Sequence, residues 1–177
     1  MEDLDELDAA AVLARAEARV LARRRVELDE LRLVARWAEL HGDDPRERPG
    51  ARRVPGSARL EEMGGDGTPR VQDLCLDELA VARRTHVLTQ RAATADVLDL
   101  QHRLPRVWGV LCRLECDAWV ARRVAVMSRS LDRQQVRLVD AAIADCIATS
   151  APSRVLAVAE AKVIEADPVA HAERVRA

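Results

Sequence analysis

The chain has 177 residues, of which 49% are hydrophobic, 33% are charged and 2% are aromatic, and its formal net charge is −2. A chain of this length fits one domain, with or without an appended helix, and can bury a hydrophobic core. No uninterrupted apolar run approaches the roughly 20 residues of a membrane-spanning helix, and the acidic start at residues 2–6 is unlike a secretory signal. We therefore expect a cytoplasmic protein with no membrane partner.

The chain contains neither Phe nor Tyr, so its core must be built from Leu, Val and Ala. A core with so few aromatic residues suits closely packed helices better than a sheet. We predict an all-α fold with a long amphipathic N-terminal helix (residues 1–40) and a flexible Gly/Pro-rich connector (41–71). A helical domain (72–177) follows, with a bundle of about six short-to-medium helices.

A stripe of Leu and Ala runs along the first segment, from residue 4 to residue 40. Its members recur every three or four residues, the pattern of a helix that buries one face. They are Leu4, Leu7, Ala11, Ala14, Ala18, Leu21, Leu28, Leu31, Ala35 and Ala38, with Arg25 as the only interruption. We favour packing against the rest of the chain, because small Ala residues suit close helix contacts. A homo-oligomer through the helix 4–40 is the alternative.

Glycines and prolines crowd the connector at residues 41–71 and leave room for one helical turn at most, at residues 57–63. Within it, Gly64-Gly65-Asp66-Gly67-Thr68 invites comparison with a phosphate-binding loop. A Gly-Lys-Ser/Thr sequence does not follow it, and no apolar strand precedes it. A tight turn explains these glycines better.

Beyond residue 71 the apolar spacing predicts helices separated by short breaks. Pro105 ends one helix through the restriction that it places on Leu104, and Asp117 is an expected N-cap. Ser130 or Asp132, and later Ser153, are the other expected caps. The predicted helices are 72–84, 88–103, 106–115, 117–129, 131–149 and 153–166, with a short helix from Pro168.

Positive charge is concentrated in residues 83–137, which hold 11 arginines against 5 acidic residues, a net +6 between negative flanks. This asymmetry indicates an anionic partner, although arginines that merely solvate helix faces are the alternative. Residues 77–100 also have a helix-turn-helix layout, with Arg84-Thr85-His86 as the turn. The alternative for this layout is a helical hairpin used only for packing.

DNA is the partner that such a layout would bind, with base contacts from the second helix and phosphate contacts around it. The expected groove-facing residues are Gln90, Arg91 and Thr94. The expected phosphate-binding residues are Arg83, Arg84, Arg103, Arg106, Arg122, Arg123 and Arg129.

Several other side chains are expected to be structural. His102 sits at a helix end, where it would satisfy carbonyl groups or Asp99 rather than an anion. Trp108 and Trp119 lie among Val and Leu at helical spacing and are expected to anchor the core. The four cysteines are expected to be buried small hydrophobes. One pair of them, at 112 and 116, is a helical turn apart but lacks two further ligands, so we expect no metal site and no cofactor.

A set of motifs spans residues 64–168: GGDGTP at 64–69, DLQHRLPRVW at 99–108, WVARRV at 119–124 and ADP at 166–168. In this combination, residues 60–170 resemble the helical domain of unknown function 222 of actinobacterial proteins, which often carry an HNH nuclease at their C-terminus. The resemblance implies a helical domain with no known chemistry of its own, preceded by a glycine-rich turn. Relatives often have Gly near the position of Arg84, and this chain departs from them there.

The nuclease centre itself is missing from the sequence. An HNH site needs His as general base, Asn to orient water and further ligands for a divalent metal, and this chain has no Asn and only isolated histidines. Neither G-x-S-x-G nor H-E-x-x-H occurs. We therefore expect no enzymatic activity, but a non-catalytic helical domain of an HNH-endonuclease-like protein, associated with DNA through its Arg-rich segment. The alternatives are a structural or protein-interaction module and a remnant of a nuclease without its catalytic domain.

Overall fold

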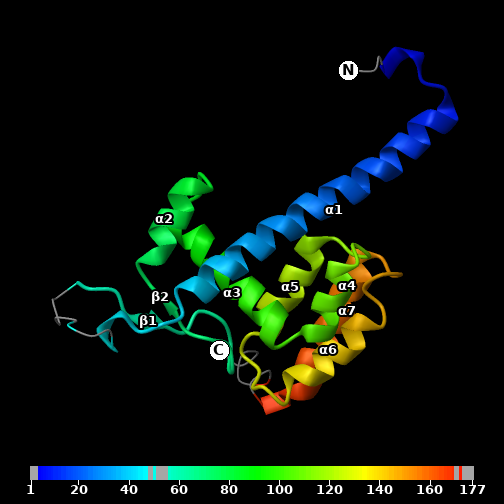
Figure 1. The fold of residues 1–177 in the computed structure, drawn as a ribbon. Coiled ribbons are helices and arrows are strands. Elements are labelled where there is room, and N and C mark those ends of the chain that lie inside the picture. Colours follow the sequence, from blue (N-terminus) through cyan, green and yellow to red (C-terminus); the bar gives the residue numbers. More distant parts are fainter. Residues whose placement is uncertain (1–3, 48–49, 51–55, 170–171, 173–177) are drawn as a thin grey trace.

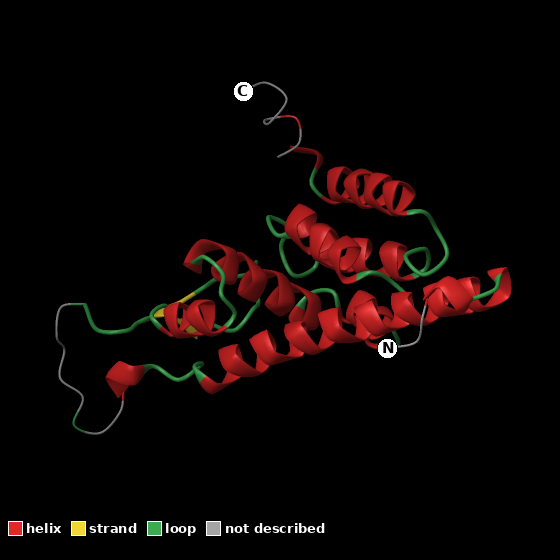
Figure 2. Cartoon of the chain, turned by 90° about the horizontal axis from the view of Figure 1, so that it is seen from above, coloured by secondary structure: helices red, strands yellow, loops and turns green. Residues whose placement is uncertain are grey.

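The computed structural model describes residues 4–47, 50, 56–169 and 172, and over these residues the regular structure is helical apart from one short pair of strands. One long helix, α1, lies along a bundle of shorter helices, and its N-terminal end reaches beyond them (Figures 1 and 2). The predicted all-α class is confirmed. The helices are α1 (Ala9–Leu40), α2 (Cys75–Ala82), α3 (Val87–His102), α4 (Pro105–Cys112), α5 (Ala118–Ser128), α6 (Val136–Ala144) and α7 (Pro152–Ala166), with short 3-10 turns η1 (Leu4–Glu6) and η2 (Pro45–Glu47).

Helix α3 is the centre of the fold and packs against α1, α2, α4 and α5. All eight residues from Ala93 to Leu100 are buried, so this part of the helix is enclosed on every side rather than along one stripe. The main core joins α1, α3, α4, α5, α6 and α7 through Leu and Val side chains. A smaller core around Met63, Val71 and Leu76 joins α2 and the preceding loop to the end of α1.

Helix α1 is buried along only half of its length. Its buried residues begin at Leu28 and end at Ala38, and no earlier residue of α1 is buried. Leu13 lies five turns before Leu31 on the same side of the helix and is still 67% exposed, so the burial stops because α1 extends past the end of the bundle (Figure 1). The prediction that the stripe packs within the chain is therefore right for its C-terminal half and wrong for the part before Leu28.

The break between α3 and α4 follows from Pro105 as predicted, and its capping group comes from another helix. Pro105 occupies the first turn of α4, where its missing N–H costs nothing. The next two backbone N–H groups, of Arg106 and Val107, donate to the carboxylate of Asp140 on α6 at 3.1 and 3.0 Å. Burial raises the pKa of Asp140 even though these hydrogen bonds act to lower it. A carboxylate on α6 thus fixes the start of α4.

Other local predictions differ from the structure. Residues 57–63 form no helical turn, since Leu60–Glu61 pairs antiparallel with Val71–Gln72 as a two-stranded ladder. Ser153 lies within α7, because Pro152 already starts that helix. The predicted helix 131–149 is shorter, and Asp132 caps the turn before it by accepting from Gln134 and Gln135.

Candidate functional site

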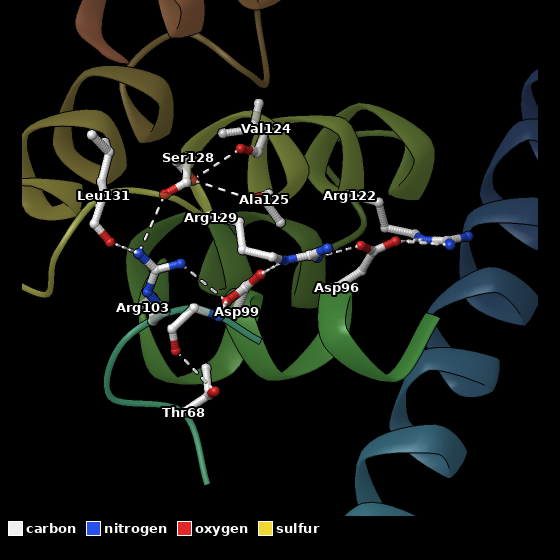
Figure 3. A network of polar contacts seen from close by, with 11 residues as sticks. Thr68, Asp96, Asp99, Arg103, Arg122, Val124, Ala125, Ser128, Arg129 and Leu131 are labelled. Atoms are coloured by element: carbon white, nitrogen blue, oxygen red, sulfur yellow. Dashed lines mark hydrogen bonds and ion pairs between the residues drawn. The ribbon is translucent and has the colours of Figure 1, made fainter. Parts of the chain in front are cut away.

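A buried ion-pair network links the glycine-rich loop at residues 64–68 to α3 and α5 (Figure 3). Asp99 is fully buried, and its Oδ1 accepts from the backbone N of Gly65 at 2.8 Å and from Arg103 Nη1 at 3.1 Å. Its Oδ2 accepts from Arg129 Nε at 2.6 Å. The Arg103 guanidinium also donates to the carbonyl oxygens of Ser128 and Leu131. These bonds satisfy a buried carboxylate, whose unpaired burial would be costly.

The network continues toward α1 through a second carboxylate, Asp96, one helical turn before Asp99. Its Oδ1 accepts from Arg129 Nη2 at 2.7 Å and its Oδ2 accepts from Arg122 Nε at 2.9 Å. Burial acts against the charge of Arg129, but its hydrogen bonds to Asp99 and Asp96 raise its pKa above the ordinary value. We call Asp96, Asp99, Arg103, Arg122, Arg129 and the Gly65 amide the loop–helix network. It has three guanidinium groups and two carboxylates, and it ties α3 to α5.

The paired glycines of the loop are required by this packing. A Cβ atom on Gly65 would overlap the Arg103 guanidinium and the carbonyl oxygen of Arg129. On Gly64 it would lie 2.8 to 2.9 Å from Thr68 and from the Asp99 carboxylate. The Gly65 amide, which a phosphate-binding loop would offer to a ligand, already donates to Asp99. The loop is therefore a tight turn that closes over the network, and the Thr68 hydroxyl donates to the Gly65 carbonyl within it.

Three of the residues expected to contact DNA are inside the protein. Gln90 and Thr94 are buried, and they bond to each other and to Arg83 instead of facing outward. Arg103 is buried in the loop–helix network. The groove-facing prediction for Gln90 and Thr94, and the phosphate prediction for Arg103, are wrong because α3 is enclosed by its neighbours.

Four further predicted residues are engaged in ion pairs. Arg83 contacts Glu30 of α1, Arg91 contacts Glu61 of β1, and Arg122 and Arg129 share Asp96. The remaining three, Arg84, Arg106 and Arg123, are exposed and lie on different elements. The residues predicted to contact DNA therefore do not all lie on one exposed face.

The turn between α2 and α3 is tight even though it contains no glycine. Arg84 adopts a φ of 53°, in the left-handed region that glycine favours. The N–H of Thr85 donates to the carbonyl of Ala80 at 2.9 Å, which is the bond of a Schellman cap. The helix-turn-helix layout thus forms, but its second helix is the enclosed α3.

Other side chains also differ from their predicted roles. Trp119 is 51% exposed and does not anchor the core, whereas Trp108 packs against it as predicted. His102 is exposed, and Asp99 accepts from Gly65, Arg103 and Arg129 instead. Burial raises the pKa of the thiols of Cys75 and Cys116 to about 11, in keeping with the inert role expected of cysteines. Cys112 and Cys146 are only partly buried.

The first half of α1 exposes apolar side chains where the helix extends beyond the bundle. We call residues 9–22 the projecting segment (Figure 1). Its exposed large apolar residues include Leu13, which is 67% exposed, Val20 and Leu21. Val20 lies one helical turn before Arg24. At 100° per residue, Leu13, Ala16 and Val20 share the side of α1 that later carries Leu31 and Ala35. The sequence analysis missed this face because it followed a repeat of seven residues.

An ion-pair cluster marks the place where α1 leaves the bundle. Arg24 Nε donates to Asp117 at 2.8 Å, Arg23 Nη2 donates to the same carboxylate at 3.1 Å, and Arg24 Nη1 donates to the Leu114 carbonyl. The hydrogen bond from Arg24 holds the pKa of Asp117 below its ordinary value. Asp117 is the N-cap residue of α5 as predicted, but its carboxylate bonds to α1 rather than to its own helix.

Comparisons of the chain with protein families, curated proteins and solved structures found no match. The resemblance to the nuclease-associated helical domain therefore remains a prediction. No helix in the described part of the chain is long and apolar enough to cross a membrane. Within the same residues, no three His, Cys, Asp or Glu side chains gather as metal ligands.

Proposed function

We propose that this chain is an assembly module that pairs with a second copy of itself through the projecting segment of α1. The observation that carries the proposal is the exposure of Leu13, Val20 and Leu21 on a helix that continues past its own bundle. A single amphipathic helix in water is marginal, and burying its apolar side against a partner stabilises it.

The charges of this region favour an antiparallel pair. Residues 4–8 carry Asp5, Glu6 and Asp8 and no basic residue, whereas residues 15–25 carry five arginines and one acidic residue, Glu17. A parallel pair would place like charges side by side. In an antiparallel pair about an axis near Ala16, Asp8 of one copy lies opposite Arg24 of the other, and Arg15 lies opposite Glu17. The same patch is then used by both copies, as in a twofold dimer.

Sedimentation velocity on the full chain tests the proposal. We expect a dimer for the wild-type chain and a monomer for Leu13→Glu/Val20→Glu, with an unchanged thermal melt of the bundle, because neither side chain is in the core. Leu88→Glu is the matched control, since Leu88 is 68% exposed on α3, outside the projecting segment. A wild-type monomer at all concentrations, or a dimeric double variant, contradicts the proposal.

Sequence-independent association with DNA is the second candidate. Its support is that Arg84, Arg106 and Arg123 are exposed and have no assigned ion pair within the described ranges. Binding through such contacts weakens log-linearly with salt, and Arg106→Ala/Arg123→Ala should lower affinity for all DNA sequences about equally. An electrophoretic shift assay on the wild-type chain that shows no DNA binding at ~50 mM salt removes this candidate.

The assembly proposal also fits the expected role beside a nuclease domain, in which this chain supplies no chemistry.

A further inference from the structure

A concave site lies at the opposite end of α1 from the projecting segment. It is a cavity of about 530 Å³ between the last turns of α1, the segment after the glycine-rich loop and the end of α3. This volume lies within the range of small-molecule sites, ~300–1,000 Å³. Ala35, Ala38 and Leu98 form its apolar floor, and Pro69 adds one wall.

The rim of this cavity is cationic. Arg32 and Arg36 extend from α1 and Arg70 follows the loop, whereas Glu39 is the only carboxylate among the described residues that line the cavity. The cavity therefore combines an apolar floor with exposed guanidinium groups around it. Arginine forks match the oxygens of phosphates and carboxylates, so the chemistry selects an anion.

The rim arginines are unequally engaged. Arg36 Nη1 donates to Glu39 at 2.7 Å, and Arg32 lies 3.7 Å from Asp29, with both pairs exposed to solvent. Arg70 is exposed, and no ion pair is assigned to it within the described residues. Burial, and next to it the positive charge of Arg133, keep the pKa of His102 below its ordinary value. Arg133 thus adds a positive charge near this end of α3, and the guanidinium of Arg70 is available to a ligand.

We propose that this cavity binds a small organic anion, with an apolar body on the floor of Ala35, Ala38 and Leu98 and a phosphate or carboxylate held by Arg70. This site is separate from the projecting segment and goes beyond the assembly function. The long polymer of a nucleic acid fits it less well, because the apolar floor lies inside a concavity and only the rim is charged.

Isothermal titration calorimetry on the full chain tests this site with four probes: 1-naphthyl phosphate, 1-naphthoate, inorganic phosphate and 1-naphthol. We expect at least one of the two organic anions to bind, with inorganic phosphate and 1-naphthol clearly weaker, because each lacks one half of the recognised chemistry. Comparison of naphthyl phosphate with naphthoate separates the two anionic groups. Equal binding of 1-naphthol, or no binding of either organic anion, overturns the proposal.

Variants locate the binding. Arg70→Ala should weaken the binding of the organic anion by about tenfold, which corresponds to the loss of one charge-assisted hydrogen bond. Gln101→Trp should fill part of the cavity with its larger side chain, because Gln101 lines the cavity wall. Arg123→Ala is the control, because Arg123 is equally exposed on α5 but does not line the cavity. Unchanged affinity in both Arg70→Ala and Gln101→Trp, with melts that show folded protein, places the ligand elsewhere and contradicts the proposal.

Discussion

The loop–helix network and the projecting segment use the same residue types in opposite ways. In the network, arginines point inward and form ion pairs with Asp96 and Asp99, and these ion pairs join the helices. In the projecting segment, arginines alternate with exposed Leu and Val on a helix that leaves the bundle. The position of nearby carboxylates therefore decides whether an arginine joins helices inside the protein or stays on its surface. Arg-rich sequence alone does not identify a surface for DNA.

The first prediction concerns Arg103, at the centre of the loop–helix network. Arg103→Ala should lower the free energy of unfolding by about 3–5 kcal/mol, because it leaves the buried Asp99 carboxylate short of a partner. Arg123→Ala, an exposed arginine of α5, should change it by less than about 0.5 kcal/mol. Urea denaturation of both variants measures the difference. Similar small effects in the two variants would show that the network contributes nothing to the fold.

A second prediction concerns the glycine that lets the loop approach. Gly65→Ala should destabilise the fold by about 2–3 kcal/mol, because its Cβ would overlap the Arg103 guanidinium and a backbone oxygen. Gly109→Ala is the matched control in the middle of α4, where the nearest atom lies 3.6 Å away. There alanine should stabilise by about 0.5–1 kcal/mol through helix propensity. Thermal melts that shift in the same direction for both variants would contradict the close packing of the loop.

A third prediction concerns the pH dependence of the ion pairs that Asp117 forms at the base of the projecting segment. The pKa of Asp117 is lowered in the folded state, so its ion pairs stabilise the protein above the ordinary pKa of 3.8, and this part of the stability is lost as the pH falls through the folded pKa. Asp117→Asn lacks this contribution. We expect wild type to exceed the variant by about 1 kcal/mol near neutral pH, and the gap to close in acid. A gap that is constant from neutral to acidic pH would rule out the ionised carboxylate as its source.

The smallest prediction concerns the turn between α2 and α3. Arg84 has a φ of 53°, so Arg84→Gly should relieve strain and raise the free energy of unfolding by up to about 1 kcal/mol. The Schellman bond of Thr85 should remain, since it uses only backbone atoms. A measurable loss of stability in chemical denaturation would mean that the Arg84 side chain contributes contacts that outweigh its backbone conformation.

The helices could be predicted from the sequence because their signals are local. Apolar spacing predicted 88–103 and 153–166, and the structure has Val87–His102 and Pro152–Ala166. Pro105 and Asp117 marked their boundaries through chemistry that acts within a few residues. Helix class and order followed from these signals, whereas the predicted helix 131–149 is shortened to Val136–Ala144.

The sites could not be predicted in the same way, because their contacts are distant in sequence. Asp99 and Arg103 show the spacing of a helical ion pair, a signal that could have been used. Their bonds to Gly65, 34 residues away from Asp99, and to the carbonyl of Leu131 depend on tertiary packing. The exposure of Leu13 depends on where the bundle ends. The cavity likewise arises from three segments that meet only in the fold.

Hydrogen exchange along the full chain, at two protein concentrations about a hundred-fold apart, tests the central comparison most directly. We predict slow exchange of the Gly65 amide and of α3 at both concentrations, because these groups belong to the enclosed network. The projecting segment should exchange rapidly at the low concentration and become protected at the high one, as the helices of two copies pair. Rapid exchange of Gly65 and α3, or a projecting segment whose exchange does not depend on concentration, would contradict the account.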